Sequence, residues 1–256
     1  MIMKLKGVFF DLYGTLLIPK NSKKAWKNWF TTFYKLMRIY GLKSSKIDFS
    51  NECNGFFSRA EPKENVEGLT IYENKIRDFA IDLNLILENS EIKKIASDCV
   101  NAWHKYIKID PESLPLLEVL KNKKSLALIT NFDHPPYIYS VLSDYKLAKY
   151  FESITISGEI GFKKPDPQIF HITLKKMGLG PDEVVYIGDS KEDIEGANNA
   201  KIKPILIQRQ KLKKLLSGND YFSKKIAKNP NMQNSRIKPW KTISNLQDLY
   251  KLLNLL

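Results

Sequence analysis

The chain has 256 residues, a length that suits one large domain or a core domain with a second domain inserted into it. It carries 41 Lys and Arg against 28 Asp and Glu, and the resulting net charge of +13 favours anionic ligands. No run approaches the roughly 20 apolar residues of a membrane span. The apolar N-terminal stretch carries Asp11 and lacks a small-residue cleavage site, so we expect a cytoplasmic protein without a membrane anchor.

The composition also argues against several classes of site. Cys53 and Cys99 lie far apart and outside any paired motif, so we expect buried thiols. His104, His134 and His171 do not have the spacing of a zinc site. Arginine is scarce while lysine, asparagine and isoleucine are frequent, which indicates a compositional bias, and we do not expect nucleic acid as a partner.

The first expected element is a buried strand over residues 5–10. Apolar side chains at helical spacing then predict three helices, over residues 22–40, 70–86 and 90–106. Ser22 is the expected N-cap of the first helix. Residues 20–107 are therefore predicted to form an all-helical domain, whose aromatic faces we expect to pack against one another.

After residue 107 the pattern changes to strands that alternate with helices. Strands are predicted over residues 125–130, 153–157, 183–189 and 203–208, and helices over residues 113–121, 136–146, 167–178 and 193–200. This alternation predicts an α/β fold with a doubly wound parallel sheet, built from residues 1–19 and 108–256, into which the helical domain of residues 20–107 is inserted. Residues 209–241 are basic and irregular, which indicates a solvated loop, and residues 241–256 are predicted to form a final helix.

Polar side chains follow four of the predicted strands. They are Asp11 after the first strand, Thr130 and Asn131 at the second, Lys163 and Lys164 beyond the third, and Asp189 at the fourth, with Asp193 one helical turn later. Ligands of open α/β sheets bind just beyond the carboxyl ends of the strands. We therefore expect these side chains to converge on one site.

The motifs around these residues are DLYGT at 11–15, ITN ending at 131, GFKKPDPQIF at 161–170 and IGDSKEDIEGA at 187–197. As a set, they resemble those of the haloacid dehalogenase-like hydrolase superfamily, in particular the group with a helical cap inserted after the first motif. The resemblance implies a Rossmann-like core, a helical cap and a covalent aspartyl intermediate.

The resemblance also implies a role for each motif residue. Asp11 would be the nucleophile, Thr130 would donate a hydrogen bond to the transferring group, and Lys164 would neutralise developing charge. Gly14, Thr15 and Asn131 would shape the turn and bind the substrate. A magnesium ion would be held by the carboxylates of Asp11, Asp189 and Asp193 and by the backbone carbonyl of Tyr13.

Tyr13 stands where most phosphatases of this family carry a second aspartate that acts as general acid and base. Tyrosine has a pKa of about 10, which makes it a poor base at neutral pH. Loss of a general acid–base typically lowers the rate by about 10²–10⁴-fold. Dehalogenases of the family carry tyrosine here, and their halide leaving group needs no proton.

The other motifs favour phosphatase chemistry. The GDSKED segment resembles a metal site, Phe170 stands where the dehalogenases carry a tyrosine, and Arg38 alone offers a match to their cap arginine. Three readings stay open: a magnesium-dependent phosphatase of a small phosphorylated metabolite, a 2-haloacid dehalogenase, and a catalytically weak binding or regulatory protein. The candidate substrate contacts of the cap are Trp26, Arg38, Arg59 and Lys63. The sequence does not indicate an oligomeric state.

Overall fold

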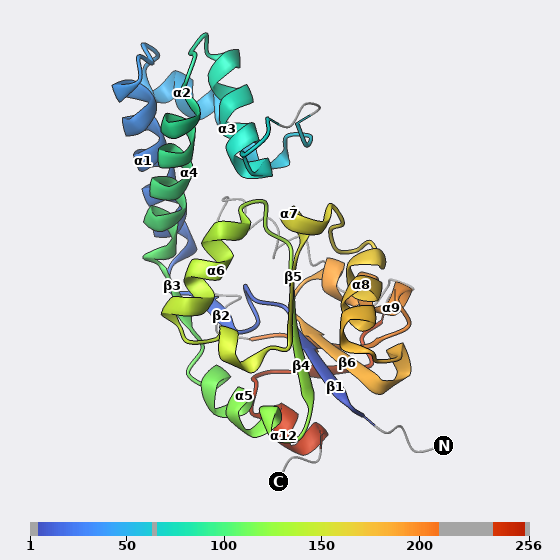
Figure 1. Ribbon diagram of the computed structural model, residues 1–256. Coiled ribbons are helices and arrows are strands. Elements are labelled where there is room, and N and C mark those ends of the chain that lie inside the picture. Colours follow the sequence, from blue (N-terminus) through green and yellow to red (C-terminus); the bar gives the residue numbers. More distant parts are fainter. Residues whose placement is uncertain (1–4, 63–65, 210–237, 254–256) are drawn as a thin grey trace.

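The computed structural model describes residues 5–62, 66–209 and 238–253. Six strands form one parallel sheet in the order β5-β4-β1-β6-β7-β8 (Figure 1). These strands are β1 (Gly7–Phe10), β4 (Ser125–Thr130), β5 (Ser153–Ile156), β6 (Val184–Gly188), β7 (Lys203–Ile207) and β8 (Lys241–Ile243). The predicted α/β fold with a parallel sheet is therefore confirmed.

Helices cover both faces of this sheet. They are α5 (Ser113–Lys121), α6 (Pro135–Asp144), α7 (Ser157–Ile160), α8 (Gln168–Met177), α9 (Lys191–Asn199) and α12 (Asp248–Leu252), with 3₁₀ turns at Ala148–Tyr150 and Pro181–Glu183. Val8 and Phe10 of β1 join a core cluster that includes residues of α5, α6 and α12, whereas Phe9 joins a second cluster with residues of α8 and α9. Because both faces are covered, the central strands are continuous apolar runs.

The register of the central strands determines where the polar strand ends meet. Phe10 at the end of β1 pairs with Leu128 of β4 and with Ile187 of β6. Asp11 therefore leaves the sheet between the ends of these two neighbouring strands, beside the residues that follow them.

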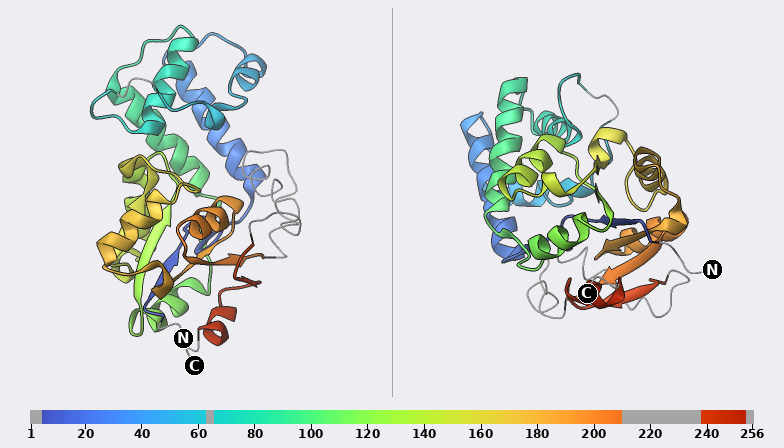
Figure 2. Two further views of the ribbon diagram at one scale, coloured as in Figure 1. Left: turned by 90° about the vertical axis from the view of Figure 1, so that its right-hand side faces the viewer. Right: turned by 60° about the horizontal axis from the view of Figure 1, so that its bottom comes forward.

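A second group of helices lies between β2 (Leu17–Pro19) and β3 (Ile107–Ile109) in the chain. The group consists of α1 (Ser22–Ile39), α2 (Lys46–Glu52), α3 (Ile71–Asp82), α4 (Asn89–His104) and a 3₁₀ turn at Phe56–Ser58. We call it the helical insertion. It stands beyond the carboxyl ends of the sheet strands, with α1 and α4 side by side (Figures 1 and 2).

The sequence did not predict strands β2 and β3. They form an antiparallel ribbon in which Leu17 pairs with Ile109 and Pro19 with Ile107. The chain thus leaves the sheet and returns to it through one paired connection. The domain boundaries at residues 19/20 and 107/108 stay a prediction. The ribbon gives them a physical basis, because it pairs the two connections at these positions.

Two further expectations about single elements are wrong. The N-cap of α1 is Asn21, whose side chain accepts a hydrogen bond from the Lys24 backbone at 2.9 Å, and Ser22 is the first helical residue. Residues 241–256 do not form one helix, because Lys241–Ile243 pair with β7 as strand β8, and the helix α12 begins only at Asp248. The β-branched pair Thr242-Ile243 suits a sheet edge better than a helix.

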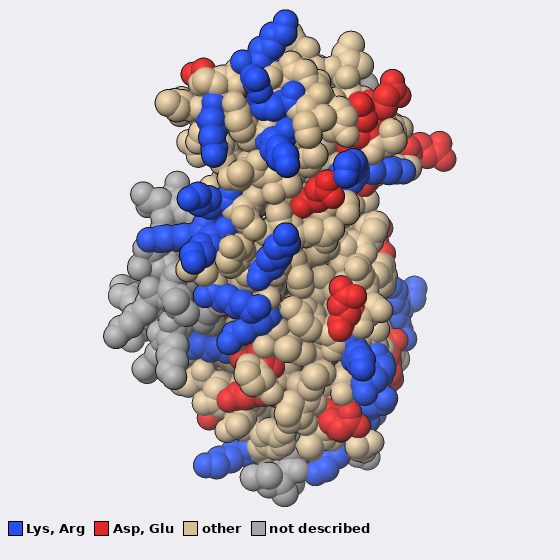
Figure 3. Space-filling model, turned by 90° about the vertical axis from the view of Figure 1, so that its left-hand side faces the viewer, with Lys and Arg blue, Asp and Glu red and all other residues tan. Residues whose placement is uncertain are grey.

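Other expectations concern the surface and the thiols. Cys53 and Cys99 are buried and unbridged, as predicted. Within the described ranges, no helix has both the length and the apolar character that a bilayer crossing needs. On the face that carries α1 and α4, the basic side chains are spread along the molecule and interleaved with uncharged surface (Figure 3). Most of the predicted basic loop, residues 210–237, lies outside the described residues.

Candidate active site

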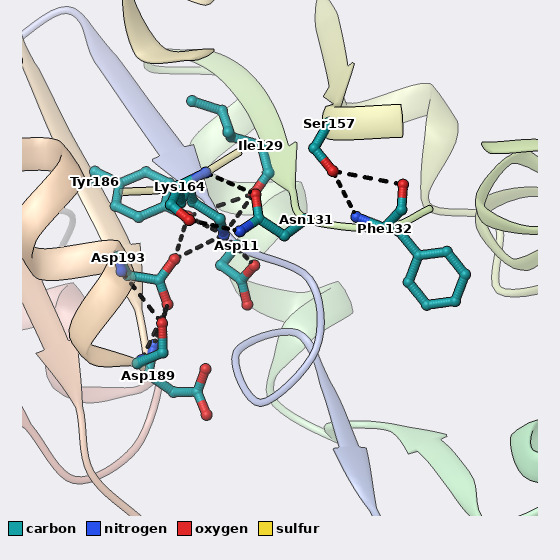
Figure 4. Close-up of polar contacts among 10 residues, drawn as sticks. Asp11, Ile129, Asn131, Phe132, Ser157, Lys164, Tyr186, Asp189 and Asp193 are labelled. Atoms are coloured by element: carbon teal, nitrogen blue, oxygen red, sulfur yellow. Dashed lines mark hydrogen bonds and ion pairs between the residues drawn. The ribbon is translucent and has the colours of Figure 1, made fainter. Parts of the chain in front are cut away.

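Asp11 and Lys164 form the centre of the candidate site. Asp11 directly follows β1, and its backbone N–H donates to the Ile187 carbonyl at 2.8 Å. The Nζ atom of Lys164 lies 2.6 Å from Asp11 Oδ1, and the lysine side chain is only 4% exposed (Figure 4). The two residues are 153 positions apart in the chain, so the fold alone creates this ion pair.

Lys164 is held by more than its contact with Asp11. Its Nζ also donates to Asp193 Oδ1 at 2.7 Å, to the Tyr186 hydroxyl at 2.9 Å and to the Ile129 carbonyl at 3.2 Å. Burial alone would lower the pKa of Lys164, but the carboxylates of Asp11 and Asp193 outweigh that effect and raise it. Lys164 is therefore a fixed cation.

Asn131 holds the backbone of Lys164 in place. Its side-chain amide donates to the Lys164 carbonyl at 2.9 Å, and its side-chain oxygen accepts from the Lys164 N–H at 2.9 Å. This two-way contact connects the end of β4 to the loop that carries the lysine. Asn131, predicted to bind substrate, thus positions the cation of the site as well.

Asp193 lies at the start of α9 with both carboxylate oxygens in use. Oδ1 accepts from Lys164 and from the Tyr186 hydroxyl, and Oδ2 accepts from Ser190 Oγ at 2.7 Å and from two backbone N–H groups. Burial opposes ionisation, but Lys164 and Ser190 together lower the pKa of Asp193 below its ordinary value. The carboxylate is therefore charged at neutral pH.

The turn after β1 approaches Asp189 closely at Gly14. This glycine has φ = +93°, and a Cβ atom added to it would lie 2.1 Å from Asp189 Oδ2. Only glycine combines this backbone conformation with so close a neighbour. Gly14 therefore allows the carboxylate of Asp189 to lie against the turn that follows Asp11.

Three acids at this point could share a cation. Asp11, Asp189 and Asp193 each offer a carboxylate oxygen, and these atoms lie within 4.8 Å of one another. Hard cations such as Mg²⁺ prefer this type of ligand. Asp11, Asp189 and Asp193 are therefore the residues that could hold such a cation.

The Tyr13 side chain is packed as an aromatic wall. Its ring meets Trp103 edge to face at 5.2 Å and stacks on Phe132 at 5.6 Å. Its hydroxyl is buried and makes no hydrogen bond to any described residue. Burial, with a smaller contribution from nearby Tyr137, raises the pKa of Tyr13 well above its ordinary value. Tyr13 therefore cannot exchange protons as an aspartate would.

A cavity of about 290 Å³ lies between the sheet edge and the helical insertion. Most of the predicted site residues line it: Asp11, Tyr13, Gly14, Thr130, Asn131, Lys164, Asp189 and Asp193. Thr15 is fully buried and is not among the lining residues. The structure therefore does not support a direct substrate contact by Thr15. The other part of the expectation, that Thr15 shapes the turn after β1, stays a prediction.

Of the predicted cap contacts that lie in the described ranges, only Trp26 reaches the cavity. Arg38 instead donates to the Lys43 carbonyl, and Arg59 pairs with Asp82 at 2.7 Å on the surface. Lys63 lies outside the described residues. The cap arginine that a dehalogenase would use has therefore no counterpart in Arg38 or Arg59.

The helical insertion meets the loop after β4 through polar contacts at the cavity. Asp133 accepts from Lys75 Nζ and from Lys163 Nζ, both at 2.8 Å, and its carbonyl accepts from the Tyr72 N–H at 3.0 Å. His134 Nδ1 lies 3.0 Å from the Thr70 hydroxyl. These contacts place α3 directly over the polar end of the site.

Tyr186 and Arg209 are two of the residues at the site that were not predicted. Tyr186 lies inside β6 and looked like an ordinary core residue, yet its hydroxyl contacts both Lys164 and Asp193. Arg209 was assigned to a solvated loop, yet its guanidinium donates to the Gly14 carbonyl and, at 2.8 Å, to the Thr15 carbonyl. Its position directly after a predicted strand was the signal that could have found it.

Comparisons with known proteins agree with this geometry. Residues 5–201 match the family model of haloacid dehalogenase-like hydrolases. The chain is 23% identical over 212 residues to N-acylneuraminate-9-phosphatase of Rattus norvegicus, covering 79% of this chain and 82% of the relative. It is 22% identical over 215 residues to (S)-2-haloacid dehalogenase 4A of Burkholderia cepacia, covering 82% and 86%. The crystal structure of a HAD phosphatase from Thermococcus onnurineus superposes with a TM-score of 0.63 at 23% identity, covering 97% of this chain and 98% of that one, and so shows the same fold.

Proposed function

Since this chain belongs to the family of haloacid dehalogenase-like hydrolases, we propose that it is a magnesium-dependent phosphatase of a small phosphorylated metabolite. The observation that carries the proposal is the meeting of Asp11, Lys164 and Asp189 at one end of a cavity. A nucleophilic carboxylate, a fixed cation and a second acid for a metal are the parts that this chemistry needs.

In the proposed reaction a carboxylate oxygen of Asp11 attacks phosphorus. The new O–P bond forms as the bond to the leaving oxygen breaks, and that oxygen keeps the electron pair and takes a proton from water. Water then attacks the aspartyl phosphate, which releases phosphate and a proton and restores the carboxylate. Both halves of the reaction take place at one buried carboxylate.

The surrounding residues have separate tasks in this proposal. Lys164 orients Asp11 through the 2.6 Å contact and offsets negative charge near the phosphoryl group. Thr130, which is buried at the end of β4 and lines the cavity, donates its hydroxyl to a phosphoryl oxygen. Asp11 and Asp189, with the Tyr13 carbonyl, would hold a magnesium ion, which when bound neutralises phosphoryl charge.

Hydrolysis of p-nitrophenyl phosphate tests the proposal. The wild-type chain should release p-nitrophenolate with Mg²⁺ and stop when EDTA is added, and Asp11→Asn should lower kcat by at least about 10³-fold. Hydroxylamine should trap the acyl phosphate on the wild-type chain alone. Turnover that persists in EDTA, or in Asp11→Asn, would contradict this mechanism.

One observation favours a second candidate, a 2-haloacid dehalogenase. Tyr13 offers no proton to a leaving group, and a halide leaving group needs none. A dehalogenase should release chloride from L-2-chloropropionate in EDTA. If neither reaction occurs, the chain acts as a binding or regulatory protein with this fold.

A further inference from the structure

The cavity above Asp11 has an aromatic wall that the phosphatase mechanism does not use. Besides Tyr13, the aromatic side chains that line it are Trp26, Trp29, Phe57, Tyr72, Trp103 and Phe132. Five of these six come from the helical insertion, and Phe132 comes from the loop after β4. A ligand that reaches Asp11 therefore has aromatic surface around its far end.

These rings are held in place by one another. Trp26 stacks on Trp29 at 4.9 Å, and Phe57 stacks on Tyr72 with an angle of 4° between the ring planes. The loop that carries Phe132 is held by a 2.9 Å hydrogen bond from its backbone N–H to Ser157 Oγ (Figure 4). The wall is thus formed before a ligand binds, which reduces the entropy lost on binding.

Two polar atoms of the wall satisfy each other, because Trp29 Nε1 donates to the Tyr72 hydroxyl at 2.8 Å. Among the described lining residues, the hydroxyls of Tyr13 and Ser22 are buried without a hydrogen-bond partner. A sugar or polyol group, which carries several hydroxyls, would leave most of them unpaired against the ring faces, and burial of unpaired hydroxyls is unfavourable. A flat apolar ring, by contrast, matches the faces that the wall presents.

Charged groups near the wall are also compensated. Lys75 is only 5% exposed and pairs with Asp133, and Lys163 pairs with both Asp133 and Glu61. Lys75, Lys163 and Asp133 line the cavity, and Glu61 compensates Lys163 from outside it. Because these charges cancel, the part of the ligand that lies away from phosphorus needs no net charge.

We propose that the substrate is an aryl phosphate monoester, whose phosphate lies at Asp11 and Lys164 and whose ring lies against Trp26, Phe57 and Phe132. This inference rests on the proposed phosphatase function. The bond from Asp11 to phosphorus forms, the bond from phosphorus to the aryl oxygen breaks, and the electron pair stays on the aryloxide, which takes a proton from water. An aryloxide is a weaker base than an alkoxide, so it leaves readily without help from an acid. Tyr13 stands where such an acid would otherwise assist, and it offers ring surface instead.

Three substrates separate ring binding from leaving-group chemistry: phenyl phosphate, benzyl phosphate and glycerol 3-phosphate, each measured with Mg²⁺. Burial of one ring is worth roughly 10- to 100-fold in binding. Phenyl and benzyl phosphate should therefore both have KM values at least about tenfold below that of glycerol 3-phosphate, and kcat should fall from phenyl to benzyl phosphate. A KM for glycerol 3-phosphate equal to or below the other two would overturn the inference and leave the phosphatase proposal intact.

Trp26→Ala tests the wall directly, with Phe30→Ala as its matched control. Both residues are half-buried aromatics of α1, and only Trp26 lines the cavity. Trp26→Ala should raise the KM for phenyl phosphate about three- to tenfold more than it raises the KM for glycerol 3-phosphate, whereas Phe30→Ala should change neither. Equal effects of the two variants would overturn the placement of the ring.

Binding of phenylphosphonate, which cannot be hydrolysed, makes the test independent of turnover. Calorimetry should give tighter binding of phenylphosphonate than of methylphosphonate to the wild-type chain, and Trp26→Ala should remove the difference. If this pattern appears although no phosphate ester is hydrolysed, the ligand class stands and the phosphatase proposal fails. If the two phosphonates bind equally, the ligand class is wrong.

Discussion

Arg209 and Asp110 form a buried ion pair, with 2.8 Å between Nη2 and Oδ2 and side chains only 10% and 8% exposed. Asp110 directly follows β3, where the chain returns from the helical insertion, and Arg209 lies just beyond β7. The same guanidinium donates to the carbonyls of Gly14 and Thr15. One side chain thus connects three distant segments beside Asp11.

Arg209→Met should destabilise the protein and disturb the turn after β1. Removal of one partner of a buried ion pair is expected to lower the free energy of unfolding by about 3 kcal/mol. That loss corresponds to a Tm about 6–12 °C lower for a chain of this size. Calorimetry measures the shift, and kcat for p-nitrophenyl phosphate at a temperature where both proteins are folded should also fall.

The matched control is Arg59→Met, which removes an arginine whose partner Asp82 is 58% exposed. Such surface pairs contribute about 0–1 kcal/mol, so this variant should lower Tm by no more than about 4 °C. Equal shifts in the two variants would show that Arg209 does not hold the turn.

Tyr13→Asp should raise activity on substrates that have a poor leaving group. A carboxylic acid at this position could protonate the leaving oxygen, and general acids contribute about 10²–10⁴-fold. We expect at least about a tenfold gain in kcat with benzyl phosphate and a much smaller gain with p-nitrophenyl phosphate, whose leaving group needs no proton. Tyr13→Phe, which adds no acid, should show no gain. If Tyr13→Asp is folded by circular dichroism and gains nothing, proton donation does not limit the reaction.

Acid should destabilise the chain through Asp193. Its pKa is lowered in the folded state, mainly by Lys164 once the opposing effect of burial is overcome, so the unfolded chain takes up this proton at higher pH. The stabilisation from Asp193 is therefore complete above the unfolded value of about 4 and is lost as the pH falls through the lower folded value. Tm measured in EDTA between pH 7 and pH 3 should fall more steeply for the wild-type chain than for Asp193→Asn. Parallel curves would contradict this assignment. Asp98→Asn, on the exposed surface of α4, should follow the wild-type curve.

Tyr186→Phe should weaken the hydrogen bonding of Lys164 without creating a cavity in the core. The substitution removes one hydroxyl that contacts Lys164 at 2.9 Å and Asp193 at 2.8 Å. Hydrogen bonds to charged groups contribute about 1.5–3 kcal/mol, so we expect a loss of that size in urea unfolding and a severalfold fall in kcat. Tyr106→Phe, at a half-buried tyrosine outside the site, serves as the control. An unchanged kcat would mean that the remaining contacts of Lys164 suffice.

The sheet and the polar strand ends could be predicted because both are local signals. The runs that became β1, β4 and β6 are continuously apolar, and Asp11, Thr130 and Asp189 stand where those runs stop. Parallel topology then places such ends on one edge. Residue type and the expected parallel topology together were therefore enough to predict that Asp11 would share one edge of the sheet with the polar residues that follow the other strands.

The parts that were missed depend on partners far away in the chain. β2 and β3 are three residues long and become strands only by pairing with each other. Tyr186 is chemically ordinary for a buried strand until Lys164 and Asp193 reach it. Arg209 stands at the start of a lysine-rich segment, and its place after a predicted strand is the one local signal, because its partner Asp110 is distant in the chain.

The ribbon of β2 and β3 has a mechanical consequence. Leu17 begins β2 and also forms a bridge with Tyr13, so the ribbon starts beside the turn that follows Asp11. Because β2 and β3 pair with each other, both chain connections between the helical insertion and the core pass through one ribbon. A substitution that unpairs this ribbon would therefore loosen both connections at once, next to the turn after Asp11.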